Sequence, residues 1–154
     1  MRWRDTKKGK FKQEEKKRYT PNISPVINRI KAFLTDSFMI FMPITYAVFY
    51  LVIGSREEFR EHMLLGWVYI MIPHFFITNA FLFFRAQTPG YKAYNIILTD
   101  DKGNRPSVFS LITRYIIFTI SIIIPPFFLI MFFTKEKLGV HDILSGTIPQ
   151  NYKA

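Results

Sequence analysis

Two ionisable side chains, Arg29 and Asp36, lie at the start of a long apolar stretch of the sequence. On an α-helix their seven-residue separation is about 700°, so both lie on one face, roughly 10.5 Å apart along the axis. A carboxylate in this position needs a partner, and the sequence offers Arg29, Arg114, His74 or water. We expect either a buried ion pair that fixes helix packing or a site that binds a proton or a cation.

A second candidate group, His74, follows Pro73 in the next apolar stretch. We interpret it as a neutral, buried imidazole, with a proton relay to Asp36 as the alternative. His62, His74 and His141 lack the spacing of metal ligands and the chain contains no Cys, so we expect no metal and no cofactor. The sequence also shows no nucleophile beside a base and no phosphate-binding loop, which argues against an enzyme.

Long apolar runs must position these residues. Runs of 24, 22 and 20 residues cover positions 30–53, 63–84 and 115–134. A helix of about 20 apolar residues crosses the roughly 30 Å hydrocarbon core of a bilayer. We therefore predict an all-α integral membrane protein with three hydrophobic helical segments, the spans covering about 30–53, 63–84 and 111–134.

Prolines interrupt the second and third runs. Pro73 lies near the middle of the second run and predicts a kink. The adjacent Pro125 and Pro126 remove two backbone donors, so we expect the third run to be kinked or broken. It then forms either one kinked span or a long helix, a bend and a short return toward the same side.

Most of the positive charge lies in an N-terminal tail. The formal net charge is +10, and residues 1–31 contain eleven Lys or Arg against three Asp or Glu, a net charge of +8. We predict that residues 1–24 are a disordered, basic, cytoplasmic tail that binds anionic lipid, at about 1 kcal/mol per basic residue. Because the membrane explains this tail, nucleic-acid binding is not expected.

Residues 25–150 then form the transmembrane domain of a multi-pass protein of the cell (inner) membrane, with the lipid bilayer as its main partner. Three short spans are few for a transport pathway, so we also expect a homo-oligomer or a membrane protein partner. The polar stretch 85–110 contains a β-prone segment, 94–99, and a turn signal at 101–104. These features predict a short cytoplasmic strand or hairpin.

Blocks of the sequence resemble the RDD family of small membrane proteins, which is named for one arginine and two aspartates. The first block is RIKA from Arg29, followed by Asp36. The second is QTPGYK from Gln87, running into IILTDDKG and then RPS. The third is LGVHD, ending at Asp142, followed by SGT from Ser145. The resemblance covers about residues 25–150, nearly the whole chain beyond the tail.

The resemblance implies a region for the site, and transport of ions or small ligands has been suggested for the family. Together with the ionisable residues above, it defines a polar cluster in or near the membrane and a cytoplasmic loop motif. The cluster is Arg29, Asp36, His74, Arg114 and Asp142, and the loop motif is Gln87, Thr88, Gly90, Lys92, Asp100 and Gly103.

The family also favours a cytoplasmic C-terminus, which would let Asp142 pair with Arg29 in preference to capping a short helix. Residues 95–99 and 147–148 could then pair as short strands, with Pro149 ending the second strand early. We predict transport of a cation or small solute through the ionisable residues. The alternative is a membrane-embedded binding or assembly module whose Arg/Asp cluster is structural.

Overall fold

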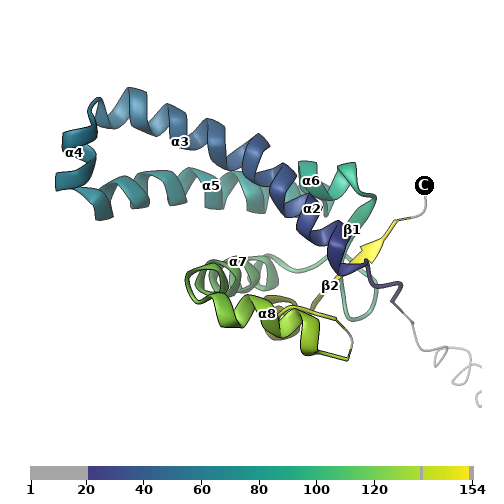
Figure 1. The fold of residues 1–154 in the computed structure, drawn as a ribbon. Coiled ribbons are helices and arrows are strands. Elements are labelled where there is room, and N and C mark those ends of the chain that lie inside the picture. Colours follow the sequence, from purple (N-terminus) through teal and green to yellow (C-terminus); the bar gives the residue numbers. More distant parts are fainter. Residues whose placement is uncertain (1–20, 136, 153–154) are drawn as a thin grey trace, which may run out of the picture.

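The computed structural model describes residues 21–135 and 137–152 (Figure 1). The predicted tail, residues 1–24, lies outside the described residues except for positions 21–24, so its disorder and lipid binding stay predictions. Within this short part, Ile23 forms an isolated antiparallel bridge with Gln150. The Ser24 amide also donates to the Pro149 carbonyl at 2.9 Å. These bonds tie the segment before the first helix to the end of the described chain.

A long helical hairpin, built from the first two apolar runs, is the largest feature of the fold (Figure 1). Gly54 ends its outgoing helix with a φ of 76°, a conformation that favours glycine. Ser55 then caps the connecting helix by accepting the Glu58 amide at 3.1 Å. The elements in order are α2 (Val26–Asp36), the π-helical segment η1 (Ser37–Phe41), α3 (Met42–Val48), the π-helical segment η2 (Phe49–Ile53), α4 (Arg56–Glu61) and α5 (Met63–Arg85).

Both arms of the hairpin are long and apolar enough to cross a membrane. The outgoing arm, Val26–Ile53, has 28 residues and the returning arm, Met63–Arg85, has 23. Only 11% of the most apolar window in each arm is buried inside the protein, so these side chains face outward as lipid-contacting helices do. The returning arm continues through Pro73 without a break.

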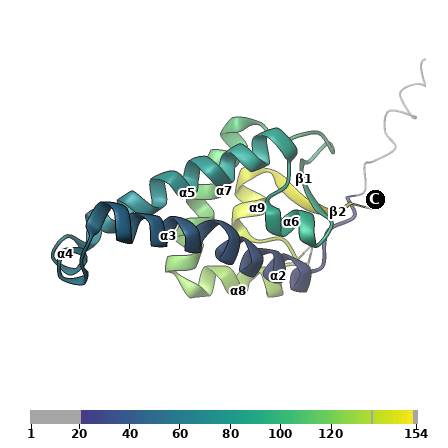
Figure 2. The same ribbon diagram turned by 90° about the horizontal axis from the view of Figure 1, so that it is seen from above.

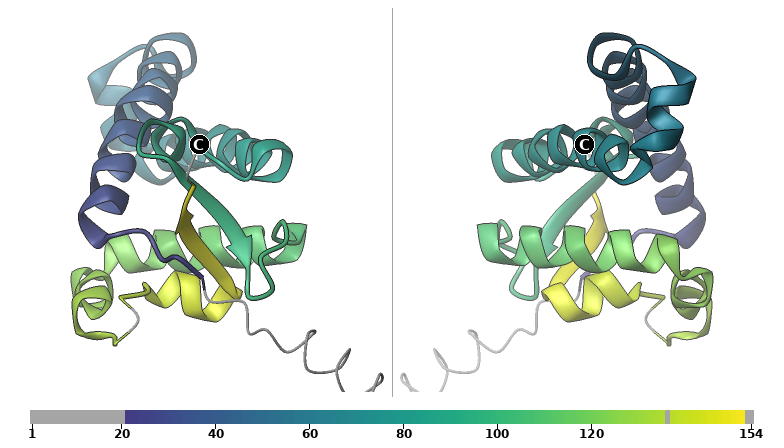
Figure 3. Two further views of the ribbon diagram at one scale, coloured as in Figure 1. Left: turned by 90° about the vertical axis from the view of Figure 1, so that its right-hand side faces the viewer. Right: turned by 90° about the vertical axis from the view of Figure 1, so that its left-hand side faces the viewer.

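The third apolar run forms two helices, α7 (Val108–Ile123) and α8 (Pro125–Phe133). Ile124, with φ −111° and ψ 89°, interrupts the helix directly before Pro125, which confirms the predicted break. Figures 2 and 3 show that α7 runs across the hairpin, whereas α8 turns to lie along its direction. Among the described residues only the two hairpin arms are long enough to span, so a third span stays a prediction.

A two-stranded antiparallel sheet lies at the open end of the hairpin, where β1 (Ile96–Asp100) pairs with β2 (Thr147–Asn151). This confirms the predicted pairing of these distant segments. The expectation that Pro149 ends the second strand early was wrong. Pro149 lies opposite Leu98 in the sheet. The Leu98 amide points away from β2 and donates to the Ala86 carbonyl at 2.8 Å. Leu98 and Pro149 are therefore paired without hydrogen bonds between them, so the sheet does not need an amide donor from Pro149.

Apolar packing differs between the two ends of the hairpin. Near α4 the buried cluster consists of Val48, Ile53 and Ile70. At the open end, Leu82, Leu98 and Leu111 join α5, β1 and α7. Two short helices, α6 (Pro89–Ala93) and α9 (Val140–Ser145), pack at this open end against α2 and α7 respectively (Figure 3). The open end is therefore where the polar residues singled out from the sequence can meet.

Candidate functional site

The buried centre of the site is the carboxylate of Asp142 on α9, a residue that is 1% exposed. It accepts a bond from Arg29 of α2, with Nη1 at 3.4 Å, and a second from Arg114 of α7. The Gly139 amide donates to it at 3.0 Å at the start of α9, and Arg29 also donates to the Lys137 carbonyl. The predicted pairing of Asp142 with Arg29 is therefore present, and helix capping accompanies it.

Arg114 connects this carboxylate to neighbouring hydroxyls. Its Nη2 donates to the Tyr91 hydroxyl at 2.7 Å, and its Nη1 donates to the Thr147 hydroxyl at 2.9 Å. The Thr147 and Ser145 hydroxyls lie 2.7 Å apart, and Ser145 donates to the His141 carbonyl at 2.6 Å. The SGT segment is thus part of the same network, which joins α7, α9 and the start of β2.

Burial and charge together set two ionisation states in this network, outside the membrane-spanning helices. Burial alone would raise the pKa of Asp142, but the positive charge of Arg114, together with the hydrogen bonds from Arg114 and the Gly139 amide, holds that pKa below its ordinary value. Burial lowers the pKa of His141 to about 4. At neutral pH Asp142 is therefore ionised and His141 is neutral. Arg29, Arg114 and Asp142 together leave one net positive charge in a buried cluster.

Asp36, the last residue of α2, has different partners from those expected. Its Oδ2 accepts the Thr88 hydroxyl at 2.6 Å and its Oδ1 accepts the Gly90 amide at 2.7 Å. In the described part of the chain, no basic side chain forms a salt bridge with it. Of the four candidate partners, neither arginine pairs with Asp36, because both guanidiniums bind Asp142. The start of α6 supplies Asp36 with two neutral donors instead.

The fit between α6 and α2 requires glycine at position 90. A Cβ added there would overlap the Ala32 carbonyl and lie 2.8 Å from Cγ of Asp36. The Thr88 hydroxyl accepts the Tyr91 amide at 3.2 Å while donating to Asp36, so it caps α6 and binds α2 at once. The aspartate in the first span thus docks the QTPGYK segment against the membrane helix.

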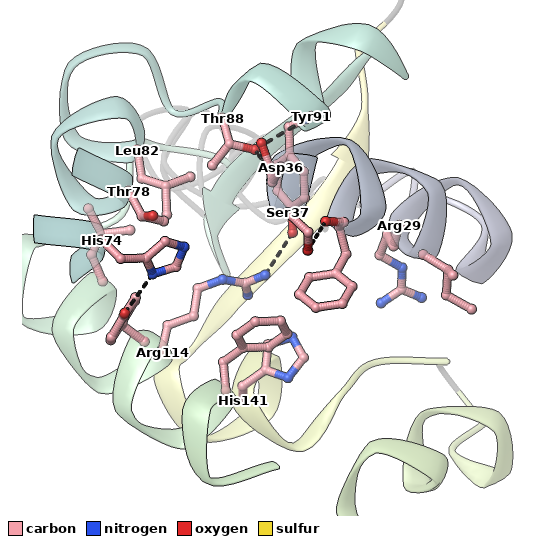
Figure 4. A pocket seen from close by; sticks show the side chains of 15 residues that line it. Arg29, Asp36, Ser37, His74, Thr78, Leu82, Thr88, Tyr91, Arg114 and His141 are labelled. Carbon is pink, nitrogen blue, oxygen red and sulfur yellow. Dashed lines mark hydrogen bonds between the residues drawn. The ribbon is translucent and has the colours of Figure 1, made fainter. Parts of the chain in front are cut away.

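A cavity of about 120 Å³ lies among α2, α5, α7 and α9 (Figure 4). Arg29, Arg114 and Asp36 line it, so both signs of charge reach the same space. Thr78 also lines it, and the buried Thr78 hydroxyl has no hydrogen-bond partner within the described structure. At about 30 Å³ per water molecule, this volume holds roughly four waters or one small ion or solute.

His74 forms another wall of this cavity (Figure 4). Its Nδ1 lies 2.7 Å from the Tyr115 hydroxyl, which links α5 to α7. Its ring meets that of Phe41 edge-on, with centroids 5.7 Å apart. No hydrogen bond among the described residues joins His74 to Asp36, so the relay between them stays a prediction.

The loop-motif residues mostly shape the polar segment between the helices. The Gln87 side chain donates to the Ile96 carbonyl at 2.8 Å and so fastens the start of β1. Asp100 accepts the amides of Lys102 and Asn104, each at 2.8 Å, in the turn that contains Gly103 at a φ of 83°. Lys92 is exposed on α6. Of the six motif residues, Thr88 and Gly90 contact Asp36 directly.

Several participants were missed by reasoning from the sequence. Tyr91 and Thr147 are bonded to Arg114, and Tyr115, Thr78 and His141 line the cavity. Tyr91 and Thr147 lie inside the quoted sequence blocks, which was the available signal. Among the described residues, no group of three or more His, Cys, Asp or Glu is arranged to hold a metal ion.

Comparison with known proteins adds a family and no activity. No curated protein and no solved structure matches the chain. The model of the RDD family matches residues 23–146, which contain both aspartates of the site and the two arginines that bind Asp142. Members of the family are generally membrane proteins, in agreement with the exposed apolar faces of the hairpin. The match covers most of the chain, and the protein belongs to the RDD family.

Proposed function

We propose that this protein has a transport-related function, in which a small solute binds in the cavity and Asp36 gains or loses a proton with it. One observation carries the proposal. Asp36 is a carboxylate on a membrane-crossing helix, it lines a cavity, and no basic side chain of the described residues pairs with it. Intramembrane carboxylates of this kind mark ion and proton pathways.

The two aspartates differ in what their surroundings allow. Asp142 is held by two arginines and a backbone amide, so releasing it would leave buried guanidiniums without a counter-charge. Asp36 has only neutral donors, Thr88 and Gly90, so protonation there breaks no ion pair within the described structure. We therefore assign a structural role to the Arg29–Asp142–Arg114 cluster and the titrating role to Asp36.

The surroundings of the site complete the proposal. In this proposal the protein lies in the cell (inner) membrane with its N-terminus on the cytoplasmic side, where the basic tail contacts anionic lipid. The hairpin offers two spanning helices, too few to enclose a pathway, so the working unit is a homo-oligomer or a complex with another membrane protein. No catalytic step is proposed.

Flux in proteoliposomes tests this function. The protein is reconstituted with a pH-sensitive dye inside, and proton movement is followed after a pH step in salts of different composition. Asp36→Asn, which keeps the shape of the side chain, should abolish solute-dependent proton movement, and Asp101→Asn, in the exposed turn after β1, should not. Equal proton movement by the wild-type protein and Asp36→Asn would refute the proposal.

A binding or assembly module is the second candidate. The observation that favours it is the buried cluster that joins α2, α7 and α9, which explains the RDD residues Arg29 and Asp142 without transport. Purification in mild detergent should then recover a second protein at a fixed ratio. A lone, monodisperse chain would count against this candidate.

A further inference from the structure

We propose that the cavity binds a small monovalent anion, of the size of a halide or a one- or two-carbon carboxylate, together with one proton taken up by Asp36. This inference rests on the proposed function and names the chemical class of its solute. It depends on the charge balance of the site, on two unused hydrogen-bond donors and on the size of the cavity.

The first step is a count of charges around the cavity. Arg29 and Arg114 contribute two positive charges, and Asp142 and ionised Asp36 contribute two negative charges. The site is therefore neutral when Asp36 is ionised and carries +1 when Asp36 is protonated, with the histidines and tyrosines neutral. The titratable or charged groups that line the cavity with Asp36 are Arg29 on α2, His74 on α5, Tyr91 on α6, Arg114 and Tyr115 on α7, and His141 on α9.

Charge balance separates the possible occupants. A buried site tolerates net charge poorly, because charge is costly to remove from water. A cation that binds beside ionised Asp36 leaves the site at +1, and so does a proton that binds there alone. A proton and a monovalent anion that bind together return the site to neutrality. Coupled binding of both is thus the loading that the surrounding charges favour.

Unused donors point to the same class of ligand. Arg29 is 7% exposed, and its buried Nε–H has no acceptor among the described residues. The buried Thr78 hydroxyl on α5 is likewise without a partner, and both residues line the cavity. A buried donor left unpaired costs about 1–3 kcal/mol. An anion supplies acceptors, which a metal cation does not.

The volume limits the size of the ligand. The cavity of about 120 Å³ equals roughly four water molecules at 30 Å³ each. Chloride, nitrate, formate and acetate fit this space.

Calorimetric titration of the protein in lipid nanodiscs tests the inference, with sodium formate and sodium chloride as the probes at several pH values. If one proton accompanies each anion, the dissociation constant should fall about tenfold for each pH unit of acidification. This slope applies where Asp36 is ionised in the anion-free protein and protonated in the complex. Weakly buffered samples should take up about one proton per bound anion. Anion affinity that is independent of pH in the wild-type protein would overturn the inference.

Three variants sharpen the test. Asp36→Asn makes residue 36 permanently uncharged, so the site keeps a charge of +1 and should bind formate with an affinity that no longer depends on pH. Thr78→Val removes a donor of the cavity and should weaken formate binding several-fold. Thr45→Val makes the same chemical change where the hydroxyl donates to the Phe41 carbonyl of its own helix, so it should leave binding unchanged. Equal effects of the two threonine variants would place the anion elsewhere.

This inference and the proposed function can fail separately. Asp36-dependent proton flux that requires a sodium or potassium gradient and no particular anion would keep the function and overturn the anion site. Formate binding with proton uptake in the calorimetric titration, but without flux in proteoliposomes, would keep the site and overturn transport. Absence of both binding and flux would overturn both.

Discussion

Replacing Asp142 by asparagine removes the carboxylate that the buried guanidiniums of Arg29 and Arg114 share. The amide fills the same volume and can still accept one hydrogen bond. It cannot offset two positive charges on side chains that are 6% and 10% exposed. The perturbation therefore acts through charge and leaves the packing of α9 almost unchanged.

The size of the effect follows from this burial. Removing one partner of a buried ion pair costs about 3–5 kcal/mol, because the other charge stays buried without compensation. Arg29→Met is the matched comparison, since it leaves the neutral pair of Arg114 and Asp142 and loses the bond to the Lys137 carbonyl. That loss costs about 1.5–3 kcal/mol, the range for hydrogen bonds to charged groups. Asp142→Asn should therefore destabilise more than Arg29→Met.

Thermal unfolding in detergent, followed by circular dichroism, measures the difference. With about 2–4 °C per kcal/mol for a chain of this length, Asp142→Asn should lower the midpoint by about 6–20 °C and Arg29→Met by a smaller amount. A shift for Asp142→Asn that is no larger than that for Arg29→Met would refute the view that uncompensated charge dominates this cluster.

Three further outcomes are expected. Gly90→Ala should lower the unfolding midpoint by more than Gly66→Ala, because a Cβ at position 90 meets the Ala32 backbone whereas at position 66 it meets the Phe59 ring, which can turn aside. Ser107→Ala should cost about 1 kcal/mol in denaturant unfolding, since Ser107 accepts the Ser110 amide at the start of α7. Acidification should also destabilise the protein. The pKa of His141 is about 4 in the fold against 6.5 ordinarily, so the unfolded chain binds the proton first and stability falls between pH 6.5 and 4, by about 3 kcal/mol. His141→Phe should flatten this slope in denaturant titrations, and an unchanged slope would contradict the assignment.

The membrane hairpin could be predicted from the sequence because its causes are local. Unbroken apolar runs set the length of both arms, and Gly54 ends the first where the charged connector begins. Pro125 and Pro126 predicted the break in the third run, where α7 ends and α8 begins. The residues of this connector form the short helix α4.

The partners of the ionisable residues could not be predicted in full, because they depend on how short elements dock. Helical spacing placed Arg29 and Asp36 on one face, but the partner of Asp36 depends on which element packs against that face. That element is α6, which supplies Thr88 and Gly90. The expected pairing of Asp142 with Arg29 came from the resemblance to the family, because no local pattern in this chain predicts where α9 lies.

Infrared difference spectroscopy of the carboxylic acid stretch tests most directly whether Asp36 is the group that titrates. Spectra of the wild-type protein minus those of Asp36→Asn are recorded in lipid while pH is lowered, with and without chloride. The structure predicts a protonated carboxyl band that is present only in the wild-type protein and that appears at higher pH when chloride is added. A band that is the same in both proteins, or the absence of any band over the pH range in which the protein stays folded, would contradict the central claim.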